Sequence, residues 1–137
     1  MGERPDDVAR IREHVRSYAT AVDRQDLEAV AACFTADCAY EGALGRGTIA
    51  DALAALAGAF ARYAHTEHVM ETPEVRLAGE TAVAETACTA HHVRHDGTRF
   101  TVGVRYRDEL VRRAGGWLIA RRTVRTEWTR EETPAAG

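Results

Sequence analysis

Three long strand-like segments in the second half of the chain constrain its fold most. They cover residues 81–95, 98–113 and 117–128, with short turn-like sequences at 96–97 and 114–116. The first turn is Asp-Gly, a strong signal for a tight hairpin, so consecutive segments should pair antiparallel. Segments of 12 to 16 residues are much longer than a usual strand and must curl. A curled sheet covered by helices encloses a pocket.

The first half of the chain has the periodicity of helices. Apolar residues recur at helical spacing from Val8 to Val22, and two further helices are predicted over 27–34 and 48–64. The sequence "HVMETPEVRLA" that follows them is strand-like, and Pro73 within it indicates a bulge or an edge position.

This order of elements predicts an α+β fold. Three N-terminal helices should pack on a strongly curved, mostly antiparallel sheet that encloses a pocket. We expect a single domain over residues 1–137, with its core over about 7–128 and a frayed tail over 129–137.

Composition and charge exclude several classes of protein. The chain is 45% hydrophobic and 28% charged, with a formal net charge of -3, which argues against non-specific nucleic-acid binding. No apolar run approaches the roughly 20 residues of a membrane span. The three cysteines show no metal-type spacing, which favours reduced thiols. We therefore expect a cytoplasmic protein that binds neither nucleic acid nor membrane.

The stretch "YAHTEHVMETPEV", residues 63–75, suggests a metal site, a catalytic base or surface residues. Side chains alternate along a strand, so His65 and His68 should face opposite sides. A zinc site needs three or four convergent ligands, which this spacing does not supply, so we expect no metal. His91 and His92 also face opposite ways, and alternation alone does not decide which of them faces the pocket.

Helix 1 carries two candidate site residues. Tyr18 lies on the apolar stripe, so its buried hydroxyl needs a partner or a cavity. Asp23 ends the helix. It fits equally a solvated carboxylate, a cap for the helix that starts near Leu27, or a site residue.

The segment 98–113 has one apolar face that should point inward. Asp108 lies on this face and is a candidate partner for a buried arginine. In the last segment, 117–128, the alternation is ambiguous, so its inward face stays open. The inward residues of 98–113 are Phe100, Val102, Val104, Tyr106, Asp108 and Leu110.

The sequences "SYATAVDRQDLEAVAACFTADCAYEG", "HVMETPE" and "VGVRYRDELVRRAGGWLIARRTVRTEW" together resemble the SnoaL-like branch of the NTF2-like superfamily. The resemblance covers about residues 8–128 and implies an α+β cone around a deep pocket. This superfamily includes polyketide cyclases, ketosteroid isomerase, dehydratases, a dehydrochlorinase and members without catalysis. Membership therefore implies the fold more firmly than the chemistry.

Within the superfamily, the dehydratase group is the best match. The bile acid 7α-dehydratase pattern places its Tyr and Asp at Tyr18 and Asp23, its His at His68, and its strand Arg at Arg125. His91 stands where that enzyme has an acidic residue, which is a departure. The scytalone dehydratase and dehydrochlorinase patterns match Asp23 and His68 but not Tyr18.

The implied mechanism needs neither a metal nor an organic cofactor. His68 is the expected base, because a carboxylate such as Asp23 fixes its tautomer and stabilises the imidazolium. Tyr18, His91 and Arg125 are the expected acid or electrophilic groups. The residues expected to shape the substrate pocket are Phe34, Tyr40, Leu56, Phe60, Met70, Tyr106 and Asp108.

These residues predict a dehydratase-type lyase that acts on a hydrophobic, polyketide- or steroid-like substrate. A polyketide cyclase or a ketosteroid-type isomerase of natural-product biosynthesis would start with the same proton abstraction. A non-catalytic ligand-binding module of the same fold is the third alternative. The resemblance implies a homodimer or a homotrimer, because the outer face of such a sheet is often covered in an oligomer.

Overall fold

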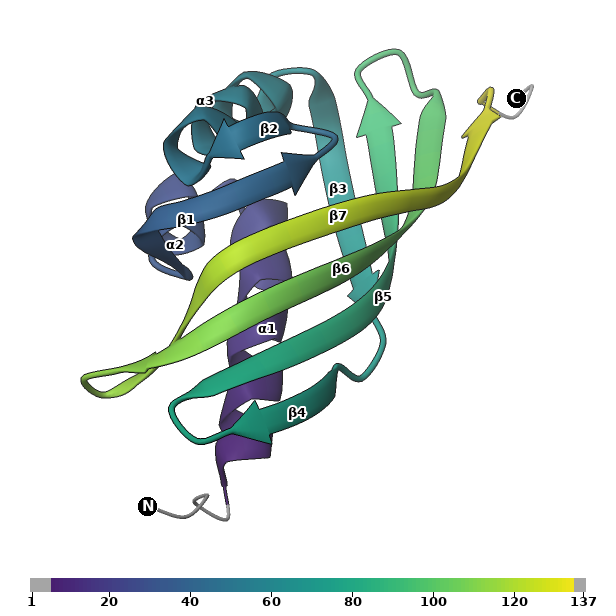
Figure 1. Cartoon of the computed structure of the whole chain (residues 1–137). Helices are drawn as coiled ribbons and strands as arrows, with labels where there is room; N and C mark the ends of the chain where they lie inside the picture. Colours follow the sequence, from purple (N-terminus) through teal and green to yellow (C-terminus); the bar gives the residue numbers. More distant parts are fainter. Residues whose placement is uncertain (1–5, 135–137) are drawn as a thin grey trace.

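Helices and strands segregate into two layers in a computed structural model that describes residues 6–134 (Figure 1). The expectations for residues 1–5 and 135–137 lie outside the described residues. None of the helices within 6–134 has the length and apolar character that a membrane span requires. The helices are α1 (Asp7–Asp23), α2 (Leu27–Ala31) and α3 (Ile49–Phe60).

The strands form one curved, unclosed sheet in the order β2-β1-β7-β6-β5-β3, with β4 beside β3 on the same edge of β5. The β1–β7 pair is parallel and the other pairs in the described chain are antiparallel. The mostly antiparallel α+β architecture is therefore confirmed. The strands are β1 (Phe34–Gly42), β2 (Gly45–Thr48), β3 (Tyr63–Met70), β4 (Glu74–Ala78), β5 (Thr81–Arg94), β6 (Arg99–Arg113) and β7 (Gly116–Glu132).

Turn chemistry explains the long hairpins. Gly97 follows Asp96 with φ 87°, a left-handed conformation that glycine adopts without steric cost, and it joins β5 to β6. Pro73 is buried in the segment that connects β3 to β4, so the strand-like segment is divided into two strands there and not merely bulged. The end of the chain differs from the expectation. Glu132 pairs with Arg99, so the first four residues of the predicted frayed tail belong to β7.

Helix α1 lies across one face of the sheet and is tied to it by packing and by charge (Figure 1). Ile11 and Val15 on its apolar stripe are fully buried, which contributes about 1.5–3 kcal/mol each. At its first residue, the carboxylate of Asp7 accepts two hydrogen bonds from Arg112, at 3.0 and 2.7 Å. The Nε1–H group of Trp117 also donates to Asp7. These contacts fix the start of α1 against β6 and β7.

Strand β7 contains two bulges that change which side chains face inward. Ala120 and Glu127 are extra residues relative to β6, because the pairing register shifts at both positions. A bulge inserts one residue and therefore inverts the alternation that follows it. The buried face accordingly passes from Ile119 to Arg122 instead of to Arg121.

Candidate active site

A cavity of about 260 Å³ lies between the helices and the inner face of the sheet. Its walls come from α1, α3, β3, β5, β6 and β7, and most of the lining surface is apolar. A cavity of this kind, with a few polar groups at its wall, is the usual form of a small-molecule site. The main apolar lining residues are Val22, Leu56, Phe60, Ala90, Val102 and Val104.

His68 lines this cavity and is hydrogen-bonded to Asp23, which is not itself a lining residue. The Nδ1 atom of His68 lies 2.7 Å from Oδ1 of Asp23, and the side chain of His68 is 9% exposed. Oδ2 of Asp23 accepts the backbone N–H of His68 at 2.8 Å, and Oδ1 also accepts the hydroxyl of Thr66 at 3.0 Å. The end of α1 is thereby joined to β3, 45 residues away.

The position of Asp23 fixes the chemistry of the His68 ring. A carboxylate only accepts hydrogen bonds, so Nδ1 of His68 carries the proton and Nε2 keeps its lone pair in the neutral ring. His68 lines the cavity. His65 on the same strand is exposed, so it faces away from His68 as the strand alternation predicted, and Glu67 is also exposed. The arrangement suits a base that accepts a proton and is then stabilised by the carboxylate.

Asp23 stays ionised in this setting. Burial raises its pKa, but hydrogen bonds from the ring and the backbone N–H of His68 and from the hydroxyl of Thr66 outweigh that effect. The pKa of Asp23 is therefore lowered from its ordinary value of 3.8. A carboxylate that is charged at neutral pH can hold an imidazolium beside it.

Tyr18 lines the cavity from α1. Its ring makes edge contacts with Phe34 and Tyr106, with centroids 6.0 and 5.9 Å apart. Burial raises the pKa of Tyr18 above its ordinary value of 10, and the positive charge of Arg122 opposes this effect only in part. The phenol is therefore neutral and able to donate a hydrogen bond.

The buried arginine of the last strand is Arg122, and the prediction of Arg125 was wrong in its placement. The side chain of Arg125 is 69% exposed and pairs with Glu127. Arg122 is fully buried and donates from Nε and Nη2 to the carboxylate of Asp108, at 2.7 and 2.9 Å. The bulge at Ala120 explains the difference, because it turns Arg122 inward.

Arg122 does not line the cavity but lies beneath it. Its guanidinium carbon is 4.2 Å from the ring centroid of Tyr18 and 4.4 Å from that of Tyr106. Asp108 was expected to shape the substrate pocket and also to pair with a buried arginine. Only the pairing is confirmed, since Asp108 is absent from the lining. The Arg122–Asp108 pair packs against the ring of Tyr18, which itself lines the cavity.

Of the two adjacent histidines, His92 and not His91 lines the cavity. Nδ1 of His92 donates to the backbone carbonyl of Phe100 at 3.0 Å, so Nε2 is the unprotonated nitrogen of the neutral ring. Its ring centroid is 6.0 Å from that of His68. His91 pairs with the hydroxyl of Thr101 instead. The prediction that His91 takes part in the site is corrected to His92.

Burial makes His92 a weak base. It lowers the pKa of His92 from the ordinary value of 6.5, although the hydrogen bond to Phe100 opposes this and the nearby His68 reinforces it. His92 is therefore neutral at neutral pH and presents a hydrogen-bond acceptor.

The remaining predicted pocket residues divide into two groups. Leu56 and Phe60 of α3 line the cavity, as expected. The others do not line it: Phe34, Tyr40 and Tyr106 belong to the buried core, and Met70 packs against that core. Burial raises the pKa of Tyr40 to about 12, so its hydroxyl is neutral.

Several lining residues had not been identified from the sequence. Thr66 has a detectable signal, because it shares the strand face of His68. Gln25 and Arg62 lie in turns, where no periodicity points to a cavity. Within residues 6–134, no group of three or more His, Cys, Asp or Glu side chains is arranged to hold a metal ion.

Comparison with known proteins agrees with this architecture. A candidate aromatic ring hydroxylase from Novosphingobium aromaticivorans superposes with a TM-score of 0.86 at 26% identity, over 96% of each chain. A candidate scytalone dehydratase from the same organism gives 0.83 at 21% identity, over 93% of this chain and 89% of the other. A hexachlorocyclohexane dehydrochlorinase gives 0.81 at 14% identity, over 91% and 88%. No curated protein sequence gives a significant match.

The family model for the SnoaL-like domain matches residues 3–123. The order of helices and strands and the open, curved sheet are those of the NTF2-like α+β fold. The chain belongs to the SnoaL-like domain family.

Proposed function

We propose that this protein is a cofactor-independent lyase of the dehydratase type. It removes water from a hydrophobic substrate that carries a hydroxyl group β to a carbonyl. The observation that carries the proposal is the Asp23–His68 hydrogen bond at the wall of an apolar cavity. The fold is shared with a candidate scytalone dehydratase and a dehydrochlorinase, and both names describe eliminations, which supports the same reaction class.

His68 acts as the base in this proposal. Its Nε2 takes a proton from the carbon next to the carbonyl, and the electron pair of that C–H bond forms an enolate. Collapse of the enolate makes the C=C bond and breaks the C–O bond to the leaving hydroxyl group. The imidazolium then returns the proton to the leaving oxygen, which departs as water. Asp23 stabilises the imidazolium in between.

The other polar groups at the wall orient the substrate. The neutral hydroxyl of Tyr18 donates a hydrogen bond to the carbonyl oxygen, where negative charge develops. The free Nε2 of His92 accepts a hydrogen bond from the leaving hydroxyl group and so fixes its direction. Leu56 and Phe60 pack against an apolar body, which favours a ring-bearing polyketide- or steroid-like substrate.

The test is an assay for loss of water with purified protein. Ring-bearing β-hydroxy ketones, linear polyketide analogues and ketosteroids are incubated with the wild type and with Asp23→Asn, and the products are analysed by mass spectrometry. The proposal expects loss of one water from a β-hydroxy ketone, with the rate reduced about 100-fold or more in the variant. Rearrangement without a change of mass would instead identify an isomerase, and ring closure of a linear polyketide would identify a cyclase.

A further inference from the structure

The cavity has a mouth formed by its exposed lining residues, which are Gln25, Ala43, Arg62, Thr126 and Thr129. They come from the α1–α2 turn, the β1–β2 hairpin, the α3–β3 turn and β7. Among the lining residues, all of which fall within 6–134, Arg62 alone carries a permanent charge. The guanidinium of Arg62 therefore lies at the entrance to a largely apolar cavity.

The charge of Arg62 is not neutralised by the described part of the chain. No carboxylate there lies within ion-pair distance of it, and its nearest ring contact is Tyr63, with the guanidinium carbon 6.0 Å from the centroid. Arg94 on the neighbouring strand differs, because it pairs with Glu131 at 2.9 Å. The guanidinium of Arg62 is therefore available to a ligand.

We propose that Arg62 binds an anionic group of the substrate, a carboxylate or another oxyanion, at the mouth of the cavity. The inference rests on the proposed function, because it treats the cavity as the substrate site. A guanidinium presents a planar fork of donors that matches such groups in a bidentate way. The neutral, apolar walls leave the anion no competing cation or repelling carboxylate among the lining residues.

The position of Arg62 also limits the shape of the substrate. Arg62 immediately precedes β3, and His68 lies six residues further along the chain. At roughly 3.3 Å per residue, their backbones are up to about 20 Å apart. This upper bound limits how far the anionic group can lie from the reacting carbon, and the contacts from Arg62 to Tyr63, from Tyr63 to His92 and from His92 to His68 connect the two positions along the cavity wall.

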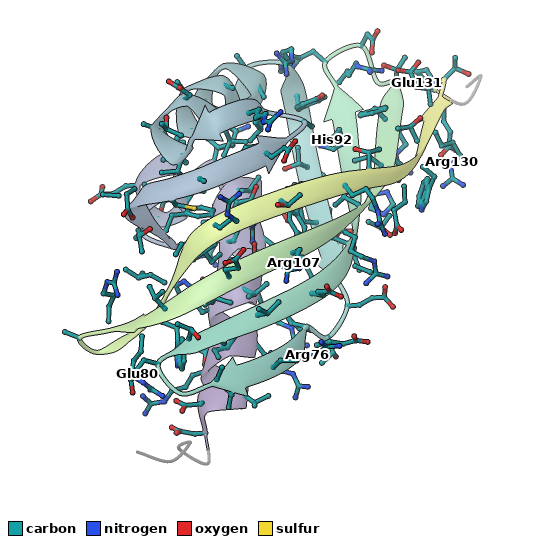
Figure 2. The ribbon with its side chains drawn as sticks, in the orientation of Figure 1. Arg76, Glu80, His92, Arg107, Arg130 and Glu131 are labelled. Atoms are coloured by element: carbon teal, nitrogen blue, oxygen red, sulfur yellow. The ribbon has the colours of Figure 1, made fainter. Side chains whose placement is uncertain are left out.

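Binding measurements test this inference without any turnover. Isothermal titration calorimetry compares a naphthyl butanoate with the matching naphthyl butanol on the wild type, Arg62→Gln, Arg76→Gln and His68→Ala. Arg76 is a matched control, because it is an exposed arginine on β4 outside the cavity lining, and Figure 2 shows it far from His92. We expect the wild type to bind the acid at least about tenfold more tightly than the alcohol.

Arg62→Gln should bind the two ligands equally, while Arg76→Gln and His68→Ala should keep the preference for the acid. Equal affinities in the wild type, a preference that survives in Arg62→Gln, or no binding of either ligand would each overturn the inference. The two proposals fail separately. Elimination that does not depend on His68 would refute the catalytic role of His68 and leave the preference for the acid unaffected. Equal binding of the acid and the alcohol, with elimination still dependent on His68, would refute only the role of Arg62.

Discussion

Asp23 uses both oxygens of one carboxylate to hold three donors, namely the ring and backbone N–H groups of His68 and the hydroxyl of Thr66. This residue was ambiguous in the sequence, where a helix end explains an aspartate as well as a site does. Its contacts make it the positioning group of the candidate base. They also lower its pKa, which has a consequence for stability.

The contribution of Asp23 to stability should depend on pH in a defined direction. Its folded-state pKa is lower than the ordinary value of 3.8, so the folded protein holds fewer protons at this site in acid. The contribution is complete above about pH 5 and is lost as the pH falls through the lowered pKa. We predict that the difference in melting temperature between the wild type and Asp23→Asn shrinks between about pH 5 and pH 2. A difference that stays constant over this range would contradict the assigned pKa.

Strand β7 shows why part of the candidate site could not be predicted from the sequence. The hairpins and the inward face of β6 follow from alternation and turn residues, and both are confirmed. Alternation fails across a bulge, and no glycine or proline marks the bulge at Ala120. The family resemblance pointed to Arg125, which is exposed, whereas Arg122 is the buried arginine.

The adjacent histidines of β5 illustrate a second limit. Alternation requires that one of His91 and His92 faces inward but does not set the phase of the strand. In the structure the phase follows from the pairing of β5 with β3, in which His92 lies opposite Thr66 and shares its cavity face. Such a long-range pairing leaves no local signal. The pairing of Asp108 with an arginine was predictable, because an inward-facing carboxylate needs a partner.

The Arg122–Asp108 pair should be critical to the stability of the β6–β7 hairpin. Both side chains are fully buried, so Asp108→Ala leaves an uncompensated charge and should lower the free energy of unfolding by about 3–5 kcal/mol. Urea denaturation measures this loss. Arg125→Ala, which removes an exposed arginine of the same strand, should change it by less than about 1 kcal/mol.

A double variant distinguishes a buried charge from simple loss of packing. Replacing both partners, as Asp108→Leu with Arg122→Met, removes the two charges together and should recover much of the loss. A double variant that is no more stable than Asp108→Ala would mean that packing, and not the unpaired charge, dominates at this position.

Helix α1 carries a carboxylate at each end that binds a residue of the sheet. Asp7 is held by Arg112 on β6, and Asp23 is bonded to His68 on β3. The helix of 17 residues spans about 25 Å between them. Figure 2 shows Glu80, which also pairs with Arg112, at the end of the molecule opposite His92. The end of α1 that carries Asp23 is therefore held by the packing of Ile11 and Val15 as well as by the contact at Asp7.

Breaking the Asp7–Arg112 pair should lower stability more than it changes ligand binding in the cavity. Asp7→Asn keeps the shape of the side chain but removes the charge that faces Arg112, so we predict a loss of about 3 kcal/mol in the free energy of unfolding. The affinity for the naphthyl butanoate, measured by calorimetry well below the melting temperature, should remain within about twofold of the wild type. The reason is that the Asp23–His68 contact is retained. A tenfold loss of affinity would show that the Asp7–Arg112 pair sets the geometry of the cavity.

His68 is proposed as the base of an elimination, and this role can be measured directly. The most direct measurement is the rate of water loss from an active β-hydroxy ketone for the wild type, His68→Ala and His65→Ala. His65 is the matched control, since it is an exposed histidine on the same strand. We predict that His68→Ala lowers kcat/KM by about 100-fold or more, whereas His65→Ala stays near the wild-type value. Unchanged activity in a folded His68→Ala protein would contradict the account.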